Sequence, residues 1–497
     1  MTHKVNLTAK NLDYATFTPA ISTFYSGFVS RQRYGKGIDT SRVPAKFEHG
    51  VEGLNFLNKD EGYFNYSFGL YSAGHAELNL DKADERDSMI QERDRESTLI
   101  LGDSGGFQIS KGVWQGDWIQ PEGSDIKTDA MRQKVLDWLE HTADYSMMLD
   151  IPTNGLKVLN EDGNPRCGLA NYDAFRDATV ANNNYFVNHR QGKTKFLNVL
   201  QGSTYAQADD WFENVCMPIE NETSGWAFGG LQKSLMNHSL RRIIYMKEMG
   251  LLDKGRSEWI HFLGTGRLDH AIIFSGIQKS LRKHVNDELI VSYDCASPFI
   301  AVANGLVYTH NVFTPKRFSY IMEKMVDDKM PYGKNEPWSW QDSPIAERLS
   351  WKDINWYDPG DLNKIGKEGR TSWDSFGYAL MMGHNVYKHI EATQNANRLV
   401  ARPSRQMKSW VPPHYLEYVE LIDDLISKDY NKDMGAIDAE LEKHELLFAK
   451  LSRTKVLKKD NTYNDFFGLA DTADEDTFDP DEEDDALRAL EESMTDE

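Results

Sequence analysis

The stretch Thr98-Leu-Ile-Leu-Gly-Asp103-Ser-Gly-Gly-Phe107-Gln108 decides how the rest of the chain is interpreted. A short apolar run is typical of a buried strand, and here an acid follows it at once. The two glycines after Ser104 allow a sharp turn and a close approach of a flat ligand to the backbone. The stretch therefore predicts either a planar ligand within reach of a carboxylate, or a tight turn in which Asp103 caps a helix.

Outward from this stretch, the chain repeats the order of strand and then helix. Such repetition is typical of a parallel sheet, and eight repeats predict a closed (β/α)8 barrel of the TIM type. Residues 1–400 are predicted to form this barrel with an insertion around 310–375, followed by a helical extension over 401–470. The eight expected strands are Pro19–Phe24, Asn65–Ser72, Thr98–Leu101, Tyr145–Leu149, Lys195–Leu200, Gly225–Phe228, Ile260–Leu263 and Leu289–Tyr293.

Polar residues and glycines gather where these strands end. Asp103, Asp150 and Asp294 each stand at the end of an apolar run, and Gln201 follows another. In an α/β barrel the carboxyl ends of all strands meet on one face, where active sites lie. Barrel loops often begin with such residues by chance, but three acids in equivalent places favour one common site. Glycine turns follow two further strands, at Gly229-Gly230 and Gly264-Thr-Gly266.

Composition limits the cellular setting. The chain has 497 residues, of which 40% are hydrophobic, so it can bury a large core. It has neither a run of about 18 apolar residues nor the apolar segment of a signal peptide, so we expect no membrane contact. Its three cysteines are too far apart to predict a disulfide framework or a zinc cluster, and a cytoplasmic location fits best. These are Cys167, Cys216 and Cys295.

Charge is distributed unevenly along the chain. Residues 471–497 hold 14 acids and one base, Arg488, which predicts a disordered acidic tail. Of the net charge of −21, only −8 is left for residues 1–470, so basic clusters there can still bind phosphates. The candidates for contact with a nucleic-acid backbone are Arg31, Arg33, Lys36, Arg402, Arg405 and Lys408.

The region after residue 310 allows two interpretations. Trp338, Trp340, Trp351 and Trp356 are either platforms for base stacking or, as we favour, the small core of an insertion. His384 and His389 lie in a helical pattern without other ligands nearby, so no metal site is predicted there.

With these residues in place, residues 15–310 resemble the queuine/archaeosine tRNA-guanine transglycosylase superfamily. That family has an eight-stranded α/β barrel, which agrees with the strand count. The matching segments follow the family's order and are Asp103-Ser-Gly-Gly-Phe-Gln108, Asp150, Val199-Leu-Gln201-Gly202, Phe228-Gly-Gly-Leu231, Phe262-Leu-Gly-Thr-Gly266, and Tyr293-Asp294-Cys295 with a later Asn304-Gly305.

Two departures from the family separate this chain from the tRNA enzymes. Those enzymes carry a zinc site of clustered cysteines and a histidine after the nucleophile, whereas this chain has no cysteine after Cys295. The basic stretch that follows their nucleophile is also missing, because residues 296–302 contain no arginine. The chain is therefore most similar to the DNA-guanine transglycosylases of phages and genomic islands, which insert a 7-deazaguanine such as 7-cyano-7-deazaguanine into DNA.

The resemblance implies a chemistry and a set of roles. Base exchange at the sugar C1′ proceeds by double displacement, with Asp294 as the nucleophile and Asp103 as the general acid/base. A guanine-like base would be sandwiched between Phe107 and Leu263, and Leu231 would sense its 7-substituent. The reaction needs no metal or nucleotide cofactor. The remaining base-binding residues implied are Ser104, Asp150, Gln201, Gly229 and Gly230.

The implied partners are DNA, with its target guanine flipped out of the stack, and a free 7-deazaguanine base. A homodimer, or an accessory protein that opens the DNA, stays an open alternative. A tRNA transglycosylase without zinc and a non-catalytic nucleic-acid-binding subunit also remain open, although the three acids together argue against the second. A glycosidase would use the acids but would not need the set of glycine turns.

Overall fold

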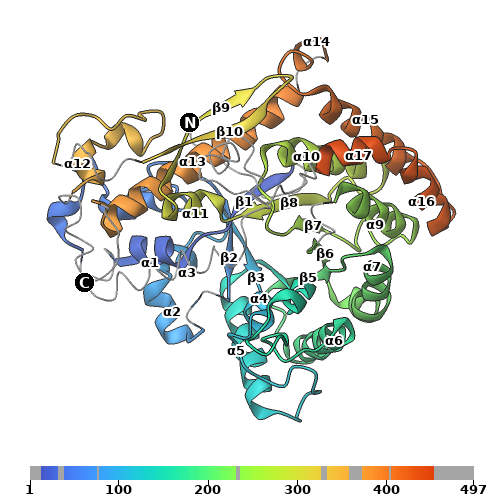
Figure 1. The fold of residues 1–497 in the computed structure, drawn as a ribbon. Coiled ribbons are helices and arrows are strands. Elements are labelled where there is room, and N and C mark those ends of the chain that lie inside the picture. Colours follow the sequence, from blue (N-terminus) through green and yellow to red (C-terminus); the bar gives the residue numbers. More distant parts are fainter. Residues whose placement is uncertain are drawn as a thin grey trace.

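A single sheet of eight parallel strands forms the centre of the molecule (Figure 1). The computed structural model describes residues 13–31, 38–74, 76, 78–230, 235–325, 333–356, 372–401 and 404–452. The strands are β1 Thr16–Pro19, β2 Phe68–Ser72, β3 Leu99–Asp103, β4 Tyr145–Met147, β5 Lys195–Leu200, β6 Gly225–Phe228, β7 Trp259–Phe262 and β8 Ile290–Cys295.

The sheet curls until its two end strands meet. The strand order is β1-β8-β7-β6-β5-β4-β3-β2, which leaves β1 and β2 at the ends. Ala20 and Leu70 form a parallel bridge between those ends, and the amide of Ile21 donates to the Leu70 carbonyl at 2.9 Å. The sheet is therefore a nearly closed barrel, which confirms the predicted α/β fold of the TIM type.

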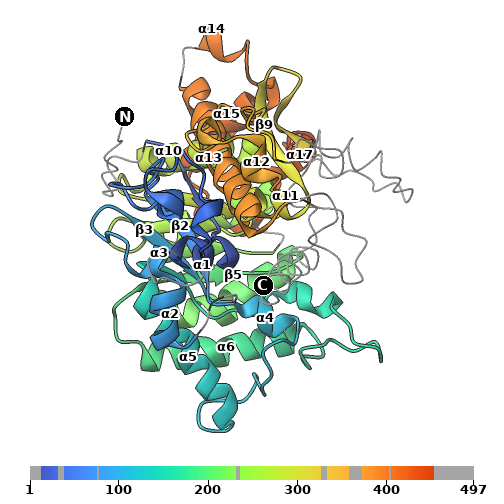
Figure 2. The same cartoon turned by 90° about the vertical axis from the view of Figure 1, so that its left-hand side faces the viewer.

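Helices surround the outside of this barrel, as the two perpendicular views show (Figures 1 and 2). Local polar side chains begin several of them, because Asp125, Asn171 and Thr204 each accept a hydrogen bond from a backbone amide of the first turn. The helices up to β8 are α1 Thr23–Arg31, α2 Leu80–Arg86, α3 Ser88–Gln91, α4 Gly106–Ser110, α5 Ile126–Thr142, α6 Tyr172–His189, α7 Tyr205–Trp211, α9 Met236–Glu248 and α10 Leu268–His284.

Shorter turns of helix complete the barrel region. A π-helical turn spans Phe212–Cys216. The 3-10 turns are Thr40–Arg42, Gly50–Leu54, Thr153–Lys157, Met217–Glu222 and Ala346–Arg348.

After β8 the chain forms helix α11, then a hairpin and then further helices. Strands β9 Leu306–Phe313 and β10 Phe318–Lys324 pair antiparallel. The helices are α11 Ser297–Ala303, α12 Trp351–Ile354, α13 Ser375–Val400, α14 Ser404–Met407, α15 Pro413–Ser427, α16 Met434–Glu442 and α17 Glu445–Ser452. No helix within the described ranges is long and apolar enough to cross a membrane.

The C-terminal helices are packed tightly onto the barrel. Helix α10 contacts both α13 and α15, so it is buried along most of its length. Gly276 permits this approach, because a Cβ there would lie 3.1 Å from a methyl of Val419. Arg241 of α9 pairs with Asp209 and with Asp438 of α16, each at 2.6 Å. The predicted division of the chain at residue 400 stays a prediction, and the predicted tail over 471–497 lies outside the described residues.

The first predicted strand was wrong. We expected Pro19–Phe24, whereas β1 ends at Pro19 and α1 begins at Thr23. The amides of Ala20 and Ile21 still donate to the carbonyls of Cys295 and Leu70, at 3.0 and 2.9 Å, before the chain turns into the helix. Ser22 then starts the helix, because its hydroxyl accepts from the amide of Tyr25 at 3.2 Å. The other seven predicted strands overlap the observed ones.

A buried ion pair ties the segment before the barrel's second strand to the longest helix. Arg42 and Asp374 expose only 4% and 7% of their side chains, and two hydrogen bonds of 2.5 and 2.6 Å join them. The same Asp374 caps α13 by accepting from the amide of Gly377 at 2.9 Å. Two structural roles thus depend on one carboxylate.

We predict that Arg42→Met lowers the free energy of unfolding by about 3 to 5 kcal/mol, because Asp374 would be left charged and buried without this partner. The double variant Arg42→Met, Asp374→Asn should recover part of this loss, since the asparagine side chain is uncharged and can still cap the helix. Urea denaturation measures both. Equal losses in the single and double variants would contradict the account.

Candidate active site

The predicted acids lie at the carboxyl ends of parallel strands. Asp103 is the last residue of β3, and Asp294 is the residue before the last of β8. Asp150 follows β4 after two residues, and Gln201 follows β5 directly. Because all eight strands run in the same direction, these residues belong to one face of the barrel.

Asp150 and Gln201 are in direct contact. The Gln201 side-chain amide donates to Oδ2 of Asp150 at 2.8 Å, and both side chains are buried. Glycines make room for this pair. A Cβ on Gly229 would lie 2.6 Å from Nε2 of Gln201, and one on Gly230, whose φ is +54°, would lie 2.7 Å from Oε1. Any side chain at these two positions would collide with the Gln201 amide, so the turn after β6 must consist of glycines.

The ionisation of Asp150 is unusual. Burial raises the pKa of its carboxyl to about 7, although the hydrogen bond from Gln201 acts in the opposite direction. The negative charge of Asp103 raises this pKa further. Asp150 is therefore poised between its neutral and ionised forms near neutral pH.

Asp103 is oriented by a residue that the sequence analysis missed. The hydroxyl of Ser72, at the end of β2, donates to Oδ2 of Asp103 at 2.6 Å. These two residues are paired in register on neighbouring strands. A polar residue at the end of an otherwise apolar strand was the available signal. Unlike Asp150, the Asp103 side chain is only half-buried.

Asp294 receives two hydrogen bonds on a single oxygen. The amide of Gly264 donates to Oδ1 at 2.7 Å, and Nε2 of His261 lies 3.0 Å from the same atom. No hydrogen bond reaches Oδ2 from any residue that the structure describes. His261, which the sequence analysis also missed, is completely buried on β7. Leu263, which we expected to contact the ring of the base, directly precedes Gly264 and is half-buried.

The segment after Asp103 folds as a tight turn, as one interpretation of the sequence expected, but the expected helix cap is wrong, because Gly105 and not Asp103 is the N-cap of α4 and no side chain caps this helix. Gly105 has a φ of +74° and precedes α4, and a Cβ on Gly106 would lie 1.6 Å from the Asp150 carbonyl oxygen. The side chain of Ser104 is fully buried, and its hydroxyl has no hydrogen-bond partner among the described residues. Phe107 is half-buried, with the Lys111 ammonium 4.5 Å from the centre of its ring.

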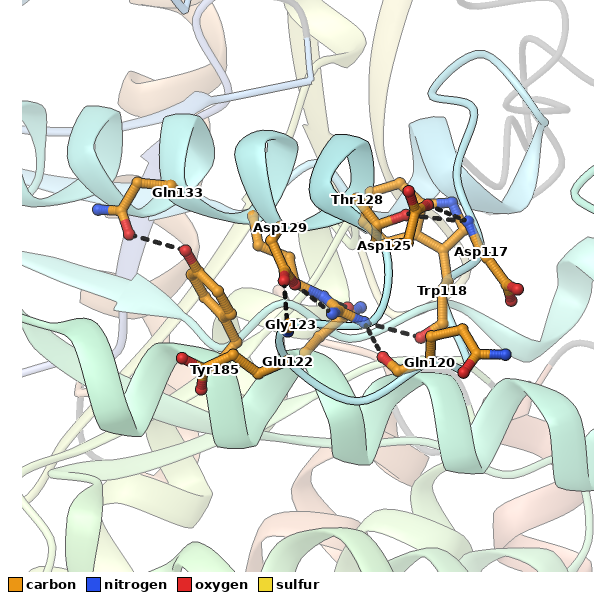
Figure 3. Close-up of polar contacts among 12 residues, drawn as sticks. Asp117, Trp118, Gln120, Glu122, Gly123, Asp125, Thr128, Asp129, Gln133 and Tyr185 are labelled. Carbon is orange, nitrogen blue, oxygen red and sulfur yellow. Dashed lines mark hydrogen bonds and ion pairs between the residues drawn. The ribbon is translucent and has the colours of Figure 1, made fainter.

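The loop after α4 is held against α5, where the amides of Asp117 and Gly123 donate to the side chains of Thr128 and Asp129 (Figure 3), and a buried arginine anchors it further. Arg132 of α5 donates to the carbonyls of Trp118 and Gln120 at 2.8 and 3.2 Å. It also donates to Asp129 at 2.9 Å and to Asn182 of α6 at 2.8 Å. These four bonds fix the loop against two barrel helices.

The same loop supports the site. The amides of Val113 and Trp114 both donate to the carbonyl of Gln108, at 2.9 and 3.1 Å. The ring of Trp114 lies against Gly105, 2.8 Å from where a Cβ would stand. Anchoring the loop therefore also fixes the turn that carries Ser104.

Several expected contacts are not placed by the structure. Leu231 lies outside the described residues, as do Arg33, Lys36 and Arg402. Arg31 ends α1, and its side chain is not described. Arg405 and Lys408 are exposed in and after α14, a short helix beyond the end of α13 (Figure 1). Contact of these residues with a nucleic acid stays a prediction.

Three of the tryptophans after residue 310, Trp338, Trp340 and Trp351, are packed together with His384. Trp338 is buried, with its ring 5.2 Å from those of Trp340 and His384. Both nitrogens of His384 have partners, the Ser343 hydroxyl and the Tyr308 carbonyl, each at 2.8 Å. Burial lowers the pKa of His384 to about 4. Within the described ranges no three His, Cys, Asp or Glu residues are arranged to hold a metal ion.

Comparison with known proteins adds no assignment. A scan against models of protein families and a search of curated proteins each found no match to this chain. The chemistry must therefore be argued from the residues of the site.

We predict that Arg132→Met releases the loop after α4. The buried carbonyl of Trp118 and the carbonyl of Gln120 would lose a charged donor, so the free energy of unfolding should fall by about 3 kcal/mol. Amide hydrogen exchange in residues 115–125 should accelerate. The control is Lys127→Met on the same helix, whose side chain is exposed; similar exchange in the two variants would refute the anchoring role.

We predict that Asp150 makes the protein less stable as pH rises. In the unfolded chain this carboxyl ionises near its ordinary pKa of about 4, but in the folded state it holds its proton up to about 7. Between these values the folded state binds more protons, so the free energy of unfolding falls with increasing pH. Asp150→Asn should flatten this dependence in urea denaturation from pH 5 to 8. An unchanged slope would show that the acid is not perturbed.

Proposed function

We propose that the protein is a base-exchange glycosyltransferase, which replaces guanine in DNA with a 7-deazaguanine through a covalent Asp294–deoxyribose intermediate. The observation that carries this proposal is that the carboxylates at one barrel face have different environments. Two donors hold one oxygen of Asp294, a hydroxyl orients the half-buried Asp103, and Asp150 is buried beside an amide. Carboxylates tuned in this way divide the roles of nucleophile, acid/base and ligand.

Asp294 is suited to attack. With Oδ1 held by two donors, Oδ2 forms a bond to C1′ of the sugar from the face opposite the base. The C1′–N9 bond breaks, and its electron pair leaves with the guanine. The incoming base then attacks C1′ through N9, and Asp294 is released as a carboxylate. The DNA chain is not cut, because only the bond to the base is exchanged.

Asp103 is suited to move the proton. It protonates the departing guanine and later accepts the proton that the incoming base must lose. Its partial exposure allows exchange of that proton with solvent. The hydrogen bond from the Ser72 hydroxyl fixes the orientation of the Asp103 carboxyl.

Asp150 and Gln201 suit the edge of a guanine. An ionised Asp150 accepts hydrogen bonds from N1–H and the exocyclic amine, a pattern that other bases lack. These donors would favour its charged form, which burial alone disfavours. Gln201 and the amide of Gly230 are suited to the O6 side, and the unpartnered hydroxyl of Ser104 can add a further bond.

The choice of DNA over tRNA is supported by the sequence. The clustered cysteines and the basic stretch of the tRNA enzymes are both missing after Asp294. A target guanine in a duplex must be flipped out, at a cost of about a few kcal/mol, to expose C1′ and the guanine edge. Stacking against Phe107 and Leu263 offsets part of that cost.

We predict that the purified protein incorporates labelled 7-cyano-7-deazaguanine into DNA and that Asp294→Ala abolishes incorporation. Duplex DNA, single-stranded DNA and tRNA are tested in parallel, with labelled guanine as a second free base. Asp294→Ala should still bind DNA, because only the nucleophile is lost.

Each outcome has a defined meaning. Label in DNA that is lost in the variant supports the proposal. Label in tRNA alone would identify a tRNA transglycosylase without zinc, and full activity of Asp294→Ala would refute the nucleophile. Absence of label from every nucleic acid with either base would favour a binding subunit.

A further inference from the structure

We propose that His261 is a positioning residue for the nucleophile, which holds one oxygen of Asp294 and so reserves the other for the sugar. This inference rests on the proposed function. Nε2 of His261 lies 3.0 Å from Oδ1 of Asp294, and the imidazole is completely buried. The Gly264 amide contacts the same oxygen at 2.7 Å. Both contacts are to Oδ1, so the two oxygens of the Asp294 carboxylate have different surroundings.

A chain of hydrogen bonds fixes the proton on the correct nitrogen. The indole N–H of Trp259 donates to the hydroxyl oxygen of Ser292 at 2.6 Å. Nδ1 of His261 lies 2.7 Å from the same oxygen, so the Ser292 hydroxyl proton is available to Nδ1. With Nδ1 accepting from Ser292, the imidazole carries a proton on Nε2, directed at Asp294. The opposite tautomer would place a lone pair against a carboxylate oxygen.

The strands build this chain through their alternation. Side chains two residues apart on a strand share one face, so Trp259 and His261 on β7 face the same way, as do Ser292 and Asp294 on β8. The two strands are neighbours in parallel, with His261 paired to Ser292 in register. All four side chains are therefore set by the barrel and not by a loop.

The arrangement acts differently on the two halves of the reaction. In the first, Oδ2 bonds to C1′ and the N9 electron pair leaves with guanine, so the charge on the carboxylate disappears. In the second, the Oδ2–C1′ bond breaks, its electron pair returns to Asp294, and charge is shared again with Oδ1. His261 and Gly264 stabilise that returning charge, and the His261 proton stays on Nε2 throughout. His261 should thus matter most for release of the sugar.

Single-turnover measurements test this asymmetry. His261→Leu removes the donor and should slow resolution of the covalent intermediate by about 100-fold, the effect of losing one donor to a developing oxyanion. DNA covalently linked to protein should then accumulate. His261→Gln, whose amide can replace the Nε2 donor, should recover resolution to within about tenfold of the native rate. If His261→Leu and His261→Gln each slowed the two half-reactions to the same extent, the proposal would be overturned, and His261 would have only a structural role.

Nitrogen-15 NMR of histidine-labelled protein tests the contact without any substrate. The His261 signals, assigned by their loss in His261→Gln, should show Nε2 protonated and Nδ1 unprotonated, and Asp294→Ala should shift the Nε2 signal. A proton on Nδ1 would overturn the proposal. Trp226→Phe is the matched control, because it removes a buried indole donor on the neighbouring strand β6 that bonds the Ser257 hydroxyl and takes no part in the chain from Trp259 to Asp294. It should therefore keep the tautomer and the ratio of the two half-reaction rates.

If the native protein exchanges no base, the proposed function fails. The NMR result still decides whether His261 holds Asp294. If the native protein shows the predicted tautomer but His261→Leu resolves the covalent intermediate at the native rate, the contact with Asp294 stands and only the catalytic role of His261 is rejected.

Discussion

Closure of the parallel sheet is the constraint on which the rest of the molecule depends. Seven pairs of neighbouring strands are joined by regular ladders, but β1 and β2 meet through the Ala20–Leu70 bridge and the Ile21 amide. A side chain helps at this seam, because the hydroxyl of Tyr66 donates to the Phe17 carbonyl of β1 at 2.5 Å. The seam matters for chemistry because β8, with Asp294, and β3, with Asp103, lie on its two sides. The relative placement of the two acids is thus set by how the barrel closes.

Within this frame, local contacts make three similar carboxylates different. Asp294 has two N–H donors on one oxygen, so its orientation is fixed and its two oxygens differ. Asp150 is buried near the charge of Asp103, and both raise the pKa of its carboxyl, to about 7. Each difference comes from a neighbour on the next strand or the turn that follows it. The barrel therefore sets the positions of the acids, and the polar residues next to them make their environments differ.

The sequence predicted the barrel and the strand-end residues because both depend on local patterns. Apolar runs of the right length predicted seven of the eight strands, and the acids and glycines at their ends stood out. The first strand was misplaced because the apolar residues after Pro19 suit a strand as well as a helix, and only the cap at Ser22 separates them. The partners Ser72, His261 and Ser292 were missed because pairing between strands distant in sequence decides what a polar strand residue contacts.

The site contains buried polar groups that lower the stability of the folded protein, so contacts outside the site must offset that cost. The Ser104 hydroxyl and the side-chain carbonyl of Gln108 are buried without partners in the described structure, each at a cost of about 1–3 kcal/mol. Asp150 adds a buried carboxyl with a raised pKa. Contacts remote from these groups offset the cost, such as the Arg132 network behind the loop and the packing of α15 on α10. Polar groups that the fold leaves unsatisfied at a strand-end face are those that a bound ligand can satisfy, so this cost is itself an argument for a ligand.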